Sequence, residues 1–113
     1  MANFKLQRQN EDIHRELTDI LRSVKDPRVD PLISIVQVDL SGDQSYCKVY
    51  VSSMQGLEKA KETVVGLKSA AGFIRHELSM RVEMRHTPEL KFIADDSIAH
   101  SAEIAKKLND IMK

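Results

Sequence analysis

Apolar side chains in the first quarter of the chain recur at the spacing of one helix face. They are Ile13, Leu17, Ile20, Leu21 and Val24, with charged residues between them. This pattern predicts an amphipathic helix over residues 5–24. Because the residue before a proline is disfavoured in the helical conformation, the Asp26-Pro27 pair ends the predicted helix near Lys25.

Two runs rich in β-branched residues follow, over residues 32–40 and 46–52. The turn-forming residues 41–44 between them predict an antiparallel hairpin, since so short a connection joins neighbouring strands. Alternate residues of a strand point to opposite faces, which divides the second strand into two sets. The predicted core set is Cys47, Val49 and Val51, and the opposite set is Tyr46, Lys48, Tyr50 and Ser52.

The strongest periodic pattern lies after Gly56, where apolar residues alternate at four and three positions. They are Ala60, Val64, Leu67, Ala71, Ile74 and Leu78. The pattern predicts a long helical stretch, which the Thr87-Pro88 pair ends. Residues 90–94 then form a short predicted third strand.

Asp95-Asp96-Ser97 supplies cap-type residues for a predicted final helix. Its apolar positions are Ile98, Ala102, Ile104, Ala105, Leu108, Ile111 and Met112. The predicted order is helix, strand, strand, a helix that glycines can break, strand and helix. We expect one α+β domain over residues 1–113, with a three-stranded sheet packed by helices on one face. Such an architecture serves many functions and decides none.

The amino-acid composition is typical of a globular domain and argues against a membrane protein. With 113 residues, 42% of them hydrophobic and 30% charged, the chain has the make-up of a globular domain. It has neither an apolar run of about 18 residues, which a membrane span needs, nor an apolar signal segment at its start, so we expect a cytoplasmic protein. Seventeen basic and seventeen acidic residues balance, so a nucleic-acid partner requires positive charge that is concentrated locally.

Ser69-Ala70-Ala71-Gly72 places four small residues inside the long helical stretch, and Gly66 lies just upstream. Glycine in a helix costs about 1 kcal/mol relative to alanine, so the two glycines favour a kink. Without bulky side chains, an RNA backbone can approach such a bend, and the amides freed there can bind phosphate. The alternative is that the small residues let the helix pack closely on the sheet, and that its charges form a solvated face.

Basic residues surround this small-residue segment. Lys61, Lys68 and Arg75 are seven residues apart, so in a continuous helix they share one stripe with Gly72. Further basic residues follow the stripe, and another basic group closes the first helix. The residues predicted to contact RNA are Lys25, Arg28, Lys61, Lys68, Ser69, Ala70, Gly72, Arg75, Arg81 and Arg85.

No set of residues indicates catalysis or a metal site, so we expect no enzyme and no cofactor. The histidines form no pair suited to a metal and are expected at the surface; they are His14, His76, His86 and His100. Cys47 is the only cysteine, which excludes an internal disulfide, and we expect it to fill space in a strand. An enzyme that used Cys47 as a nucleophile would need a neighbouring base. A small α+β ligand-binding or dimerising regulatory domain is the other alternative.

Four segments carry a family pattern. They are Lys25-Asp26-Pro27-Arg28, Lys48-Val49-Tyr50-Val51, Ser69-Ala70-Ala71-Gly72-Phe73-Ile74-Arg75, and Pro88-Glu89-Leu90-Lys91-Phe92 followed by Asp95-Asp96-Ser97. In this order and at these spacings they resemble the ribosome-binding factor A family, and the similarity runs over nearly the whole chain.

The resemblance implies a type II KH-like domain, in which an Ala-x-Gly kink between two helices, here Ala70-Ala71-Gly72, replaces the usual Gly-x-x-Gly loop. It also implies a monomeric assembly factor that binds free immature 30S ribosomal subunits through 16S rRNA. Its role would lie in late maturation, including processing of the 16S rRNA 5′ end, and in growth in the cold. The resemblance implies no small-molecule substrate and no membrane partner.

Overall fold

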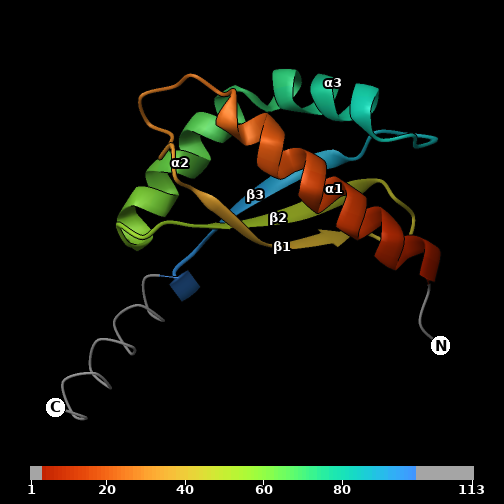
Figure 1. Ribbon diagram of the computed structural model, residues 1–113, viewed down its shortest axis with the longest axis horizontal. Coiled ribbons are helices and arrows are strands. Elements are labelled where there is room, and N and C mark those ends of the chain that lie inside the picture. Colours follow the sequence, from red (N-terminus) through yellow and green to blue (C-terminus); the bar gives the residue numbers. More distant parts are fainter. Residues whose placement is uncertain (1–3, 99–113) are drawn as a thin grey trace, which may run out of the picture.

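The computed structural model describes residues 4–98, which form helices packed on one three-stranded sheet (Figure 1). The helices are α1 (Phe4–Arg22), α2 (Leu57–Ser69) and α3 (Ala71–Arg81), and the strands are β1 (Ser34–Leu40), β2 (Tyr46–Ser52) and β3 (Glu89–Asp95). The predicted α+β fold is confirmed. The predicted final helix lies, beyond Ile98, outside the described residues.

The sheet has the order β1-β2-β3. β1 and β2 pair antiparallel, as the short turn between them predicts. β2 and β3 pair parallel, because the chain crosses back over the sheet through α2 and α3 before β3 begins. β3 therefore lies beside β2 with Tyr46 opposite Glu89 and Ser52 opposite Asp95.

The core lies between the sheet and the three helices, which Figure 1 shows on one side of the sheet. The predicted core set of β2 is confirmed, since Cys47, Val49 and Val51 are fully buried. The helices cover these residues with their own apolar stripes, in agreement with the predicted periodicity. The fully buried helical residues include Ile13, Leu17, Ile20, Ala60, Leu67, Ile74 and Leu78.

The long helical stretch is divided at Ala70, within the segment where the sequence favours a kink, and α2 and α3 run in different directions (Figure 1). It differs from the prediction at its end, because α3 stops at Arg81, well before Thr87-Pro88. Val82 takes an extended conformation (φ −120°, ψ 122°), and burial of its side chain turns the chain toward the sheet. Burial of Val82 thus ends α3 at a position that neither the apolar periodicity nor the position of the proline could predict.

No helix within residues 4–98 combines the length and the apolar character needed to cross a membrane.

Candidate nucleic-acid interface

Ala70 is the single residue between α2 and α3. Its backbone conformation (φ −97°, ψ 9°) lies outside the helical region, yet its N–H still donates to the carbonyl oxygens of Gly66 at 3.2 Å and Leu67 at 3.1 Å. The carbonyl of Ala70 in turn accepts the first hydrogen bond of α3, from the N–H of Ile74 at 2.9 Å. The break therefore creates a new helix start within the chain, and the first amides of a helix have no acceptor inside that helix.

Gly72 lies on the open side of this new helix start. Apart from its chain neighbours and the nearby backbone of its own helix, no atom lies within 4 Å of the position that a Cβ would occupy there. A groove runs from Gly72 along α3 to the loop of residues 82–88. Its lining residues are Gly72, Arg75, His76, Ser79, Arg85, His86 and Thr87, with no carboxylate among them. We call this the α3 groove.

Arg75 joins the two walls of the α3 groove. Its Nη2 and Nε donate to the carbonyl oxygen of Thr87, at 2.7 and 3.2 Å. Because a guanidinium carries five N–H donors, three of them are not used by this carbonyl. Arg85 also lines the groove and forms no hydrogen bond or ion pair within residues 4–98. The structure thus brings together three predicted contact residues: Gly72, Arg75 and Arg85.

A second hollow lies on the other side of the junction, where the end of α1 meets α2 and α3. Its lining residues are Ser23, Val24, Lys25, Asp26, Ser69, Ala70 and Phe73, and we call it the junction hollow. Nη2 of Arg28 donates to the hydroxyl of Ser69 at 3.1 Å. Four more of the predicted contact residues therefore meet here: Lys25, Arg28, Ser69 and Ala70.

Asp26 holds Arg28 in place beside the junction. Nε and Nη2 of Arg28 donate to the two carboxylate oxygens of Asp26, at 3.0 and 2.8 Å. The hydrogen bonds from Arg28 lower the pKa of Asp26 to about 2. Because this pair balances its own charge, Lys25 is the cation of the junction hollow that no described acid neutralises.

The other predicted contact residues lie apart from these two hollows. The stripe of Lys61, Lys68 and Arg75 required one continuous helix, and the break at Ala70 separates Arg75 from the other two. Lys68 is exposed, and Lys61 pairs with Glu58 at 3.6 Å near the start of α2. Arg81 turns toward α1.

Arg81 is held by three carboxylates. Its Nη1 lies 2.5 Å from Asp19 and 3.6 Å from Glu16, both on α1, and its Nε lies 3.8 Å from Glu77. The hydrogen bond from Arg81 lowers the pKa of Asp19. These ion pairs connect α3 to α1. They also neutralise the positive charge of Arg81, which the sequence predicts to be available for RNA.

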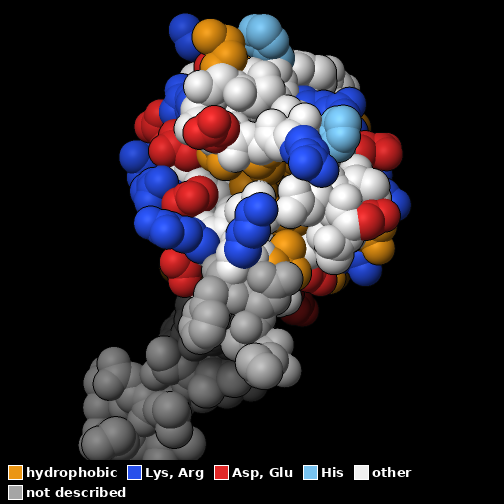
Figure 2. Space-filling model, turned by 90° about the vertical axis from the view of Figure 1, so that its right-hand side faces the viewer, with side chains coloured by type: hydrophobic (Ala, Val, Ile, Leu, Met, Phe, Trp, Pro, Cys, Tyr) orange, Lys and Arg blue, Asp and Glu red, His pale blue; other side chains and the backbone are white. Residues whose placement is uncertain are grey.

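Charges of both signs are mixed over the end of the molecule on the right of Figure 1. Figure 2 shows Lys, Arg and His side chains standing among Asp and Glu side chains there. This agrees with the net charge of zero in the sequence. On this face, a phosphate contact would be made by small groups of residues and not by a uniformly positive surface.

Sequence reasoning missed Phe73 as a site residue. Its side chain is 47% exposed and lines the junction hollow. A signal was present, because Phe73 falls one position before Ile74 and so lies off the apolar stripe that builds the core. An aromatic residue off the core stripe of an amphipathic helix is expected to face solvent.

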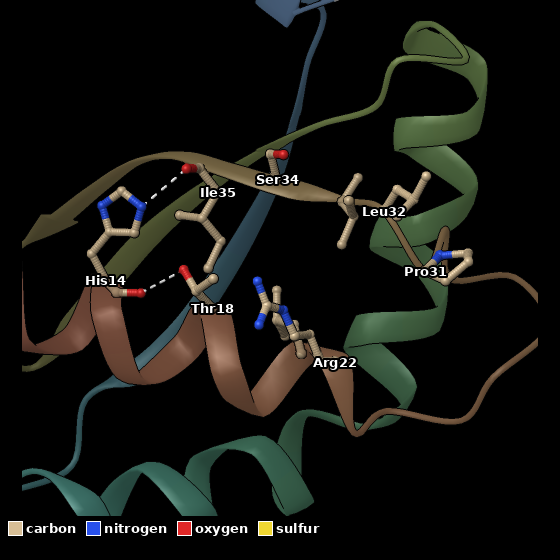
Figure 3. Close-up of a pocket in the computed structure, with 9 residues that line it drawn as sticks. His14, Thr18, Arg22, Pro31, Leu32, Ser34 and Ile35 are labelled. Carbon is tan, nitrogen blue, oxygen red and sulfur yellow. Dashed lines mark hydrogen bonds between the residues drawn. The ribbon is translucent and has the colours of Figure 1, made fainter.

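A third groove separates α1 from the edge strand β1 (Figure 3). Nε2 of His14 donates to the carbonyl of Ile35 at 3.0 Å, and the hydroxyl of Thr18 donates to the carbonyl of His14 at 2.8 Å. His14, which was expected at the surface, is half-buried and joins α1 to β1. None of the predicted contact residues lines this groove.

Cys47 lies in the core, as expected for a residue that fills space. Burial raises the pKa of its thiol to about 12, so the thiol stays protonated near neutral pH. Such a thiol is a poor nucleophile, which removes the support for a cysteine-based enzyme. Within residues 4–98, no cluster of His, Cys, Asp or Glu side chains is arranged to hold a metal ion.

Comparison with known proteins agrees with the resemblance seen in the sequence. Residues 5–108 match the family model described as Ribosome-binding factor A. A ribosome-binding factor A from Acetivibrio thermocellus is 47% identical over 107 residues, which cover 94% of this chain and 87% of the relative.

Solved structures show the same likeness. The crystal structure of ribosome-binding factor A from Thermus thermophilus has a TM-score of 0.71 and 28% sequence identity, covering 79% of this chain and 93% of its own. A homology model of the Thermus thermophilus ribosome-binding factor A, fitted into the cryo-EM map of its complex with 30S, has a TM-score of 0.63 and 30% identity, covering 75% of this chain and 89% of its own. The chain therefore belongs to the ribosome-binding factor A family.

Proposed function

We propose that this protein binds free immature 30S subunits through their 16S rRNA and assists late maturation, including processing of the 16S rRNA 5′ end and assembly in the cold. It acts as a cytoplasmic monomer, by binding and not by catalysis. Family membership supports the ribosomal partner, as does the Thermus thermophilus relative that was fitted into a map of a 30S complex.

The α3 groove is the observation that carries the RNA-binding part of this proposal. Two arginines and two histidines line it, and the bare surface at Gly72 opens one end. Arginine binds phosphate oxygens through two parallel N–H groups, and backbone amides at a helix start add further donors. The groove can therefore receive the phosphate backbone of a single strand although the protein as a whole is neutral.

The order of elements supports a type II KH-like assignment. Helix, strand, strand, helix, helix, strand follow one another, and one residue, Ala70, separates α2 from α3. KH domains clamp a short single strand by its backbone at such a helix junction. In this proposal Ala70-Ala71-Gly72 takes the place of the glycine loop, and the strand runs over Gly72 into the α3 groove.

Charge reversal within the α3 groove tests the proposal. We expect Arg85→Glu to raise the Kd for immature 30S subunits by about tenfold or more at moderate salt, because it replaces a phosphate contact by repulsion. Arg85 makes no described hydrogen bond, so the variant should fold normally. Arg8→Glu is the matched control, since Arg8 is exposed on α1, forms no described hydrogen bond or ion pair, and lies outside both hollows.

The measurement is cosedimentation of the purified protein with immature 30S subunits over a range of salt concentrations. The Arg85→Glu variant should show the weaker binding and a shallower salt dependence, while Arg8→Glu binds as the wild type does. Equal binding of all three proteins would show that the α3 groove does not contact rRNA.

A further inference from the structure

Phe73 is an aromatic side chain without a place in the core. It is 47% exposed at the start of α3, while its neighbour Ile74 is fully buried. The ring lines the junction hollow, together with the half-buried side chains of Val24 and Ala70. An exposed aromatic ring beside small apolar residues forms a flat surface that another planar group can cover.

The junction hollow also has a free cation. Lys25 is exposed and forms no hydrogen bond or ion pair within the described part of the chain. Asp26, the acid of the same hollow, is engaged by Arg28 through two hydrogen bonds of 3.0 and 2.8 Å. A ligand in this hollow therefore meets an aromatic surface and one positive charge, which is the combination that suits a nucleobase with its phosphate.

We propose that Phe73 stacks on an unpaired base of the bound rRNA and that Lys25 contacts the phosphate next to that base. The inference rests on the proposed function and assigns to it a base contact outside the α3 groove. Stacking on an aromatic ring is available to every base, so Phe73 strengthens the hold on a single strand and does not select its sequence.

The two hollows flank the same turn of α3. Gly72 lines the α3 groove and Phe73 lines the junction hollow. Consecutive helical residues point about 100° apart, so a strand that crosses the first turn of α3 can lay its backbone on Gly72 and turn a base toward Phe73. The protein would then hold the strand by its backbone on one side of the turn and by a base on the other.

Substitution of Phe73 tests the stacking contact. The probes are a single-stranded RNA octamer, the same octamer with abasic central nucleotides, and immature 30S subunits. We expect Phe73→Leu to weaken binding to the intact octamer roughly 5- to 100-fold, and Phe73→Tyr to restore it. Because the side chain is half-exposed, the unfolding midpoints of all three proteins should agree.

Phe73→Trp supplies a direct optical readout. The chain contains no tryptophan, so this variant has a single indole, placed at the proposed contact. Its fluorescence should be quenched by the intact octamer and remain unchanged with the abasic octamer at saturating concentration. Quenching of equal size by both would overturn the stacking proposal.

The remaining outcomes separate this inference from the proposed function. Wild-type octamer and subunit binding by Phe73→Leu, together with loss of binding by Arg85→Glu, would reject the stacking contact and keep the RNA-binding groove. Loss of subunit binding by Phe73→Leu without loss of octamer binding would assign the junction hollow to a ribosomal protein, which also rejects the base contact. Unchanged binding by both variants would reject both proposals.

Discussion

Gly66 and Gly72 stand on either side of Ala70, yet their surroundings are opposite. A Cβ added at Gly66 would lie 2.7 Å from Cγ2 of Val29 and 3.4 Å from both Cβ of Arg28 and Cγ of Asp26. A Cβ added at Gly72 would meet no atom within 4 Å beyond its chain neighbours and its own helix backbone. The space beside Gly66 is occupied by the protein's own chain, whereas the space beside Gly72 is open.

The comparison shows that a glycine in a helix can serve either close packing or an open surface, and that the sequence alone does not distinguish the two. From the sequence, both glycines are predicted to favour a kink. Gly66 instead lies inside α2, where it lets the turn of residues 26–29 pack against that helix. The alternative expected the small residues to let the helix pack closely on the sheet, but Gly66 packs against this turn instead. Gly72 stays open, and its contact with RNA remains a prediction.

The turn that fills the space above Gly66 is anchored by a buried carboxylate. Asp30 is 2% exposed; it accepts hydrogen bonds from the hydroxyl of Ser53 at 2.5 Å and from the N–H of Leu32 at 2.9 Å. Its own N–H donates to the hydroxyl of Thr63 on α2 at 3.1 Å. These bonds join the turn to the end of β2 and to α2.

The largest expected effect is the loss of this anchor. Asp30→Ala should lower the free energy of unfolding by about 3 kcal/mol, because it leaves the buried hydroxyl of Ser53 and the part-buried N–H of Leu32 without their acceptor. Urea unfolding of both proteins measures the difference. Asp96→Ala, which removes an exposed carboxylate, should change the stability little. An equally small change for Asp30→Ala would show that the turn is held by packing alone.

The next effect tests the filled space at Gly66 directly. Gly66→Ala should lower the free energy of unfolding by about 1–2 kcal/mol, since overpacking of about 1–3 kcal/mol exceeds the gain in helix propensity of up to about 1 kcal/mol. The branched, buried side chain of Val29 has little freedom to move away.

A double-mutant cycle with Val29→Ala sharpens this test, because that change removes Cγ2. In the Val29→Ala background, Gly66→Ala should cost nothing or stabilise the protein. The same loss in both backgrounds would exclude the contact with Val29 as its cause.

The open glycine should respond in the opposite direction. Gly72→Ala should raise the free energy of unfolding by up to about 1 kcal/mol, because alanine favours the helix and meets no neighbour. Under the proposed function the same change weakens binding to immature 30S subunits by covering the bare backbone. Thermal unfolding and cosedimentation measure the two effects. A destabilised Gly72→Ala variant would remove the contrast with Gly66.

The smallest expected effect is the loss of stability in acid that comes from the half-buried Asp26–Arg28 pair beside Gly66. The pKa of Asp26 is lowered from 3.8 to about 2, so the pair stabilises the fold above pH 4 and this contribution is lost as the pH falls toward 2. The stability difference between the wild type and Asp26→Asn should therefore be present at pH 5 and disappear near pH 2. A difference that stays constant between these pH values would show that the charge of Asp26 is not its cause.

The helices and the hairpin could be predicted because their signals lie within a few residues. The spacing of Ile13, Leu17 and Ile20 marks α1, and the alternation of Cys47, Val49 and Val51 marks the buried face of β2. The structure brings the predicted contact residues together only in part, because helical phase placed Lys61, Lys68 and Arg75 on one stripe that the break at Ala70 divides.

By itself, the sequence determined which segments become helices and strands, which of their faces are buried, and the family to which the chain belongs. Only the tertiary structure decided that Val29 packs against Gly66, that Arg81 forms an ion pair with Asp19, and that Phe73 stays outside the core. The physical reason is the distance along the chain over which the interacting residues are separated. Periodicity reports on neighbours along one element, whereas these outcomes depend on contacts between elements that are far apart in the chain.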